Sequence, residues 1–119
     1  MFNPTKPIFI QVAEIIENQI LDGSLQPHDQ TPSTNEFQQI YAINPATARK
    51  GLNLLIEDNV LYKKRGLGMF VSDDAKAIIV KKRQDIFFNE KIPALLNEMA
   101  RLNIAVETFI EKLSEVNHA

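Results

Sequence analysis

The stretch that decides the fold runs from residue 44 to residue 71 and reads NPATARKGLNLLIEDNVLYKKRGLGMFV. Asn44 is a favourable N-cap and Pro45 suits the first helical position, so a helix is expected to begin here and to end near Asp58. Two apolar runs, 60–62 and 69–71, flank a basic turn with two glycines and predict paired strands. A short helix followed by a basic hairpin is the layout of a winged helix-turn-helix.

Two further helices are expected before this stretch. Between Pro7 and Leu21 apolar residues recur at helical spacing: Ile8, Val12, Ile15, Ile16 and Ile20. The second helix should begin after Pro32, because Ser33 and Glu36 have the spacing of a capping box. Its inner face is expected to hold Phe37, Ile40 and Tyr41.

The helix that begins at Pro45 has two faces of different chemistry. The inner residues are expected to be Ala48, Leu52, Leu55 and Ile56. The opposite side carries polar or small residues, which are Ala46, Thr47, Arg49, Lys50 and Asn53. An arginine side chain there can donate to both N7 and O6 of a guanine in the major groove. The alternative for Arg49 is a solvated arginine paired with Asn53 or with a carboxylate.

Charge is distributed unevenly along the chain, although the net charge is only −2. Residues 49–83 hold nine basic and four acidic side chains, a balance of +5. The flanks are acidic, at −4 for residues 1–48 and −3 for residues 84–119. A basic island of this kind is typical of a DNA-binding surface, and an ordinary solvated surface is the alternative. Three of the cations, Lys63, Lys64 and Arg65, precede Gly66 at the expected hairpin tip.

A change of composition after Ser72 predicts two domains, at residues 1–74 and 75–119. The second should be helical, with a kink or division at Pro93 and a left-handed cap at Asn103. Its apolar face is too wide for two helices to bury alone, which favours a homodimer interface. The residues expected there are Ile79, Ile86, Phe87, Leu95, Leu96, Met99 and Phe109. The alternative is a tail that folds back to complete its own core.

Several classes of function have little support in the sequence. The chain has no cysteine, and His28 and His118 lack neighbours at metal-ligand spacing, so no metal or cofactor site is expected. No nucleophile-elbow motif occurs, and an enzyme is not expected. No signal peptide or membrane span is recognisable, so a soluble, cytoplasmic protein without membrane contact is expected.

Five motifs, at the family's order and spacing, resemble the DNA-binding domain of the GntR family of bacterial transcription regulators. They are Pro7-Ile8-Phe9 with Gln11-Val12, Gly23-Ser24-Leu25-x-Pro27, Pro32-Ser33-x-x-Glu36-Phe37, Asn44-Pro45-x-Thr47-Ala48-Arg49 and Gly66-x-Gly68-x-Phe70-Val71. The tail of about 45 residues resembles the short two-helix tail of the YtrA-type subfamily. The resemblance implies a mainly helical winged helix-turn-helix with a small β-hairpin and a two-helix dimerisation tail. It also implies a homodimeric repressor of an inverted-repeat operator.

By position, the resemblance implies that Arg49 contacts base edges and that Thr47 contacts a phosphate. It also implies that Arg65 and Gly66 enter the minor groove. Asn35 stands where most members carry an arginine, and His28 and Thr31 replace a glycine and a leucine of the family pattern. The complete expected DNA surface is Ser33, Thr34, Asn35, Asn44, Thr47, Arg49, Lys50, Lys64, Arg65 and Gly66.

Two questions stay open at the level of sequence. A winged helix can also serve as a protein-interaction adaptor without specific DNA binding, and the acidic flanks and apolar tail would suit that role. A small-molecule effector could bind between the tail helices or at a dimer seam, but no residue pattern identifies one. The operator sequence, the target genes and the choice between repression and activation are not encoded in any motif.

Overall fold

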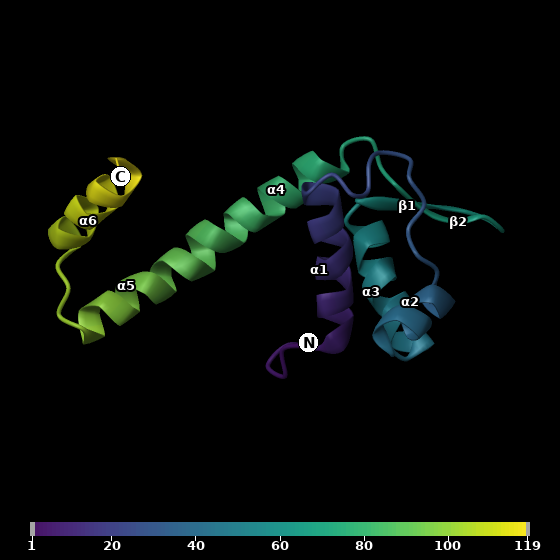
Figure 1. Ribbon diagram of the computed structural model, residues 1–119, viewed down its shortest axis with the longest axis horizontal. Coiled ribbons are helices and arrows are strands. Elements are labelled where there is room, and N and C mark those ends of the chain that lie inside the picture. The colour runs from purple at the N-terminus through teal and green to yellow at the C-terminus, as the bar shows by residue number, and fades with distance from the viewer. Residues whose placement is uncertain (1, 119) are drawn as a thin grey trace. The chain divides into compact units, whose positions relative to one another are not determined.

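The computed structural model describes residues 2–118, and its internal packing divides the chain into two compact units, Met1–Lys81 and Lys82–Ala119. Within the described residues the fold is mainly helical, with one two-stranded antiparallel hairpin (Figure 1). The expected fold class, a winged helix-turn-helix followed by helices, is confirmed.

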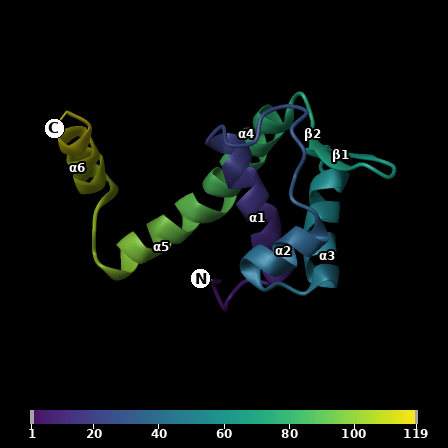
Figure 2. The ribbon, with the colours of Figure 1, turned by 45° about the vertical axis from the view of Figure 1, so that its right-hand side comes forward.

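Three helices form the body of the first unit: α1 (Ile8–Leu21), α2 (Thr34–Tyr41) and α3 (Pro45–Glu57). The helices α1 and α3 lie side by side, and α2 packs across the N-terminal part of α3 (Figures 1 and 2). Gly51 permits the close approach of α1 and α3. A Cβ at Gly51 would lie 2.6 Å from the carbonyl oxygen of Phe9 and 2.8 Å from the Cβ of Val12.

Local capping signals set the beginnings of α2 and α3. Ser33 and Glu36 form a complete capping box, in which each side chain accepts from the other residue's backbone amide. The Oδ1 atom of Asn44 accepts from the amide of Ala46, and Pro45 occupies the first turn. Both predictions are confirmed. Pro7 is the N-cap of α1 rather than its first residue.

The β-hairpin joins β1 (Leu61–Lys64) to β2 (Gly68–Val71), with Tyr62 opposite Phe70 and Lys64 opposite Gly68. The strands are longer at the turn than the apolar runs indicated. The segment before α2 also pairs with β2, because the amide of Thr31 donates to the carbonyl of Met69 and the amide of Val71 donates to that of Asp29. Figures 1 and 2 both show the hairpin tip extending beyond the helices of this unit.

The core of the first unit draws on all of its elements, including the start of α4 (Ala75–Ile86). Phe37, Leu52 and Leu55 are fully buried, as expected. Ile40 was expected inside but is 62% exposed, so α2 buries Phe37 and leaves Ile40 at the surface. Ala75 and Ile79 join the same core, so the first unit continues past residue 74 to Lys81.

The second unit contains the π-helical turn η1 (Phe87–Lys91), α5 (Ile92–Arg101) and α6 (Val106–His118). Pro93 accounts for the π turn. It lacks an amide donor for the carbonyl four residues earlier, and the turn before it shifts to the wider pattern in which the amide of Ile92 donates to the carbonyl of Phe87. Asn103 has a φ of +55° and follows the end of α5, as expected for a left-handed cap.

Across residues 2–118, none of the helices combines the length and the apolar character that crossing a lipid bilayer requires.

Candidate functional site

The polar face of α3 is exposed. Arg49, Lys50 and Asn53 face solvent, while Ala48 and Leu52 turn into the core. This is the division of the helix that the sequence predicts. The ammonium of Lys50 lies 4.0 Å from the centroid of the Phe9 ring on α1, a cation–π contact. Lys50 is thus held against its own domain, whereas Arg49 extends from the exposed face of α3.

The hairpin turn carries exposed cations. Lys63, Lys64 and Arg65 are all exposed, and Gly66 adopts a φ of +78°, which favours glycine. The ammonium of Lys64 lies 4.9 Å from the centroid of the Phe70 ring, and that ring stacks on Tyr62. Within residues 2–118, neither Arg49 nor Arg65 makes an ion pair or a side-chain hydrogen bond, so both guanidinium groups are available to a ligand.

A recess of about 310 Å³ separates the hairpin from α3 and the N-terminus of α2. It brings together three of the expected DNA-binding residues, Ser33, Thr34 and Arg49. The hairpin contributes Lys63 and the stretch 67–69. The face is therefore basic, concave and bordered by a helix N-terminus, where backbone amides favour an anion.

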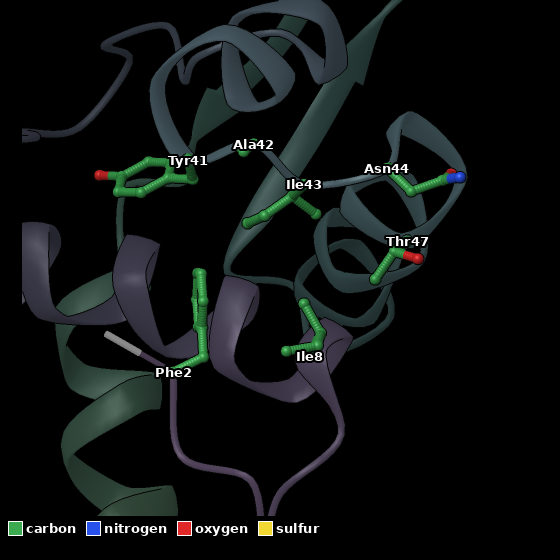
Figure 3. Close-up of a pocket in the computed structure, with 7 residues that line it drawn as sticks. All are labelled: Phe2, Ile8, Tyr41, Ala42, Ile43, Asn44 and Thr47. Carbon is green, nitrogen blue, oxygen red and sulfur yellow. The ribbon is translucent and has the colours of Figure 1, made fainter.

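Asn44 and Thr47 line a different space. This cavity, of about 240 Å³, lies between the N-terminal segment, α1 and the turn that joins α2 to α3. Figure 3 shows Phe2 and Ile8 pointing into it, while the amide of Asn44 and the hydroxyl of Thr47 point away from Phe2. Among residues 2–118, those that line the cavity are all uncharged. Its walls are mainly apolar and offer little to an ionic ligand.

Four polar residues at the recess were not among the expected site residues: Gln30, Thr31, Asn53 and Lys63. Thr31 is buried, at 5% exposure. Asn53 had a usable signal, since it follows Arg49 by four residues and therefore shares its helical face. Lys63 belongs to the basic run at the hairpin. No sequence pattern identified Gln30, because it lies in a segment without periodicity. Only tertiary pairing brings that segment beside β2.

His28 is exposed, as expected, but its ring links three segments. Its Nδ1 atom lies 2.7 Å from the hydroxyl of Tyr62 on β1, and its Nε2 atom lies 2.6 Å from the carboxylate of Asp73. The backbone of His28 has a φ of +70°, at the position where the family pattern has glycine. Residues 2–118 contain no group of three or more side chains with the spacing of a metal site.

The apolar residues expected at a dimer interface differ in exposure. Ile86, Phe87 and Leu96 are exposed, and Leu95 and Phe109 are half-buried. Met99 is buried, at 4% exposure. Ile79 requires a correction, since it is 0% exposed in the core of the first unit and presents no surface to a partner. Helical periodicity identified Ile79 as apolar but could not tell which core it enters.

Residues 10–71, from α1 to the end of β2, match the sequence profile of the family described as "Bacterial regulatory proteins, gntR family". The chain is 38% identical over 66 residues to the HTH-type transcriptional repressor NagR of Bacillus subtilis. This alignment covers 56% of this chain and 27% of NagR. It is 25% identical over 111 residues to the HTH-type transcriptional repressor YtrA of the same organism, covering 93% of this chain and 85% of YtrA. The chain thus spans about a quarter of NagR but most of YtrA.

Solved structures agree. A GntR family transcriptional regulator from Listeria monocytogenes matches with a TM-score of 0.76 and 27% identity, covering 96% of this chain and 98% of that one. The structure of AraR(DBD) in complex with operator ORE1 matches with a TM-score of 0.55 and 32% identity, covering 57% of this chain and 83% of that one.

Proposed function

The chain belongs to the gntR family of bacterial regulatory proteins, which are transcription regulators, and on that premise we propose that it is a homodimeric repressor of an inverted-repeat operator. One observation carries the DNA-binding part of the proposal. Arg49, the N-terminus of α2 and the cationic hairpin border a single exposed recess. The similarity to AraR(DBD), which was solved in complex with operator ORE1, supports DNA binding by this domain.

Each element has a separate role in this proposal. Arg49 reads base edges in the major groove, because its exposed guanidinium can donate to two guanine acceptors. The N-terminus of α2, with Ser33, Thr34 and Asn35, fixes phosphates. Asn44, the N-cap of α3, and Thr47 in its first turn do the same. Arg65 and Gly66 enter the minor groove, where the negative potential favours a cation. Lys50 and Lys64, both held over aromatic rings, add positive charge near the phosphates.

The second unit supplies the dimer interface in this proposal. Its exposed apolar side chains include Phe87, Leu96 and Leu113. A second copy that covers them would repeat the recognition helix about 34 Å away, which is one turn of DNA. An inverted-repeat operator follows from that two-fold symmetry. A small-molecule effector at this seam stays an open part of the proposal.

The test compares Arg49→Ala with the parent protein on two duplexes. One is selected by the parent protein from a random pool, and the other is its scrambled version. Affinity for the selected duplex should fall by about 1–3 kcal/mol, with a smaller loss on the scrambled one. Arg101→Ala, at an exposed arginine of α5, is the matched control and should leave both affinities unchanged. An equal loss on both duplexes would mean that Arg49 contacts only the backbone.

Salt dependence separates this function from a protein-interaction adaptor. Neutralised phosphates release counterions, so the affinity should fall steeply as salt rises. A flat response would contradict DNA binding. Binding to genomic fragments that lacks sequence preference and disappears with heparin would favour the adaptor.

A further inference from the structure

We propose that Gln30 is a positioning residue that fixes the direction of the hairpin tip relative to α3 and the N-terminus of α2. This inference rests on the proposed DNA-binding function. It assigns a role to a residue in the segment between α1 and α2 that contacts no DNA itself.

The backbone of Gln30 is held against β2. Gln30 forms an antiparallel bridge with Phe70. The flanking hydrogen bonds join the amide of Thr31 to the carbonyl of Met69 at 2.9 Å, and the amide of Val71 to the carbonyl of Asp29 at 3.0 Å. A two-stranded hairpin is marginally stable by itself, and a third paired segment supports it. This third segment pairs with β2 only as far as the carbonyl of Met69, so its backbone stops short of the turn at residues 65–67.

The side chain of Gln30 extends that support to the turn. Its Nε2 atom donates to the carbonyl oxygen of Leu67 at 2.7 Å. The amide of Leu67 in turn donates to the carbonyl of Lys64 and closes the turn around Arg65 and Gly66. One amide group therefore connects the segment before α2 to the part of the hairpin that carries Arg65.

Gly68 makes room for this contact. Its φ is +122°, and a Cβ built there would lie 2.6 Å from the Nε2 atom of Gln30. Apart from atoms of the immediate chain neighbours of Gly68, the three heavy atoms nearest to that position all belong to the side chain of Gln30. Glycine at position 68 thus leaves room for the side-chain amide of Gln30 and also permits the positive φ of the backbone.

The same short segment leads directly into the site. Ser33, the N-cap of α2, follows Gln30 by three residues. Gln30, Ser33 and Arg49 all line the recess between α3 and the hairpin. Because Gln30 ties the tip to this segment, the phosphate-binding helix end and the minor-groove cation keep a fixed separation. A mobile tip would have to become ordered when it binds DNA, and the entropy cost of that ordering would reduce the binding free energy.

Gln30→Met in the full chain removes the donor and keeps the length of the side chain. The first measurement is ¹⁵N relaxation of the free protein. Order parameters of the amides at 65–68 should fall from about 0.85 to below about 0.6, whereas those of α3 should not change. Gln26→Met, at an exposed glutamine of the same segment, is the matched control and should leave the tip ordered. An ordered tip in Gln30→Met overturns the proposal whether or not the protein binds DNA.

The second measurement is a double-mutant cycle on a duplex that the parent protein selects from a random pool. Gln30→Met should weaken binding about three- to tenfold, the range expected for one lost hydrogen bond. In an Arg65→Ala background the same change should cost less than about twofold, because the contact that Gln30 positions is already absent. An undiminished loss in that background would show that Gln30 touches DNA directly and would overturn the positioning role. Failure of the parent protein to select any duplex would refute the proposed function alone, since the relaxation experiment still decides the role of Gln30.

Discussion

The two units of the chain differ in how far their apolar side chains are buried. The first unit closes its core with fully buried residues from every element: Val12, Ile16, Phe37, Leu52, Leu55, Val60, Leu61, Val71 and Ile79. In the second unit, over residues 82–118, Met99 is the one buried residue. Its exposed apolar side chains include Ile86, Phe87, Phe88, Leu96, Leu102, Ile110, Leu113 and Val116. Exposed apolar surface of this extent marks an interaction site. It supports the partnership proposed above, in which a second copy covers these side chains.

The largest expected effect follows from breaking that partnership. The double substitution Leu96→Glu with Leu113→Glu places charges on the exposed apolar faces of α5 and α6. Burying an unpaired carboxylate is costly, so we expect a monomer by sedimentation. Affinity for the operator should fall by about 100-fold or more, because the two half-sites would no longer be bound by linked recognition helices.

The matched control places the same charges at neighbouring polar positions, Asn97→Glu with Ser114→Glu. Both residues are exposed, and the control should remain dimeric. A monomeric parent protein, or a double variant that dimerises as well as the parent, would remove the assigned difference between the two units.

A smaller effect should be confined to the first unit. Gly51→Ala forces α1 and α3 apart, because the new Cβ would lie 2.6 Å from the carbonyl oxygen of Phe9 and 2.8 Å from the side chain of Val12. Overpacking of this kind costs about 1–3 kcal/mol. Urea unfolding followed by amide signals of α1 and α3 should report the loss. Ala substitution at Gly66, where a Cβ meets no atom within 4 Å but the φ is +78°, measures backbone strain without crowding for comparison. Equal stability of Gly51→Ala and the parent would show that the two helices can separate without cost.

The contrast between the units also explains how far the sequence could predict the fold. Caps depend on residues within one turn, so the capping box at Ser33, the N-cap at Asn44 and the left-handed cap at Asn103 were predictable. Ile40 and Ile79 were misplaced because helical spacing shows that a residue is apolar but does not show which neighbour covers it. The π turn at Phe87–Lys91 was anticipated only as a kink or division at Pro93, since the way a helix absorbs a proline depends on its geometry.

The site was predictable where it follows from a helix face or from a basic run. Arg49 and the cations before Gly66 are exposed, as their positions in the sequence indicated. The recess itself was not predictable, because it combines three segments that lie far apart in the sequence. Gln30 illustrates the limit, since its contact with Leu67 spans 37 positions and depends on the pairing of a loop with β2.

The smallest expected effect concerns acid stability of the first unit. Asp22 follows α1, and its Oδ1 atom accepts from the hydroxyl of Ser24 at 2.5 Å and from the amide of Ser24 at 2.8 Å. These two hydrogen bonds lower the pKa of Asp22 below its ordinary value of 3.8. A lowered carboxyl pKa stabilises the folded state above pH 3.8, and that stabilisation disappears as the pH falls through the folded value.

Asp22→Asn keeps an acceptor for Ser24 and removes the titrating group. The stability difference between parent and variant should therefore shrink as the pH falls below about 4, when measured by thermal unfolding of the α1 signals. Ser24→Ala removes the hydroxyl, which is the larger cause of the lowered pKa, and should reduce this pH-dependent difference without abolishing it. Signals from α6 should follow the same course in all three proteins, because Asp22 lies in the first unit and α6 lies in the second. If the stability difference between the parent and Asp22→Asn grew as the pH fell, the folded state would favour protonated Asp22.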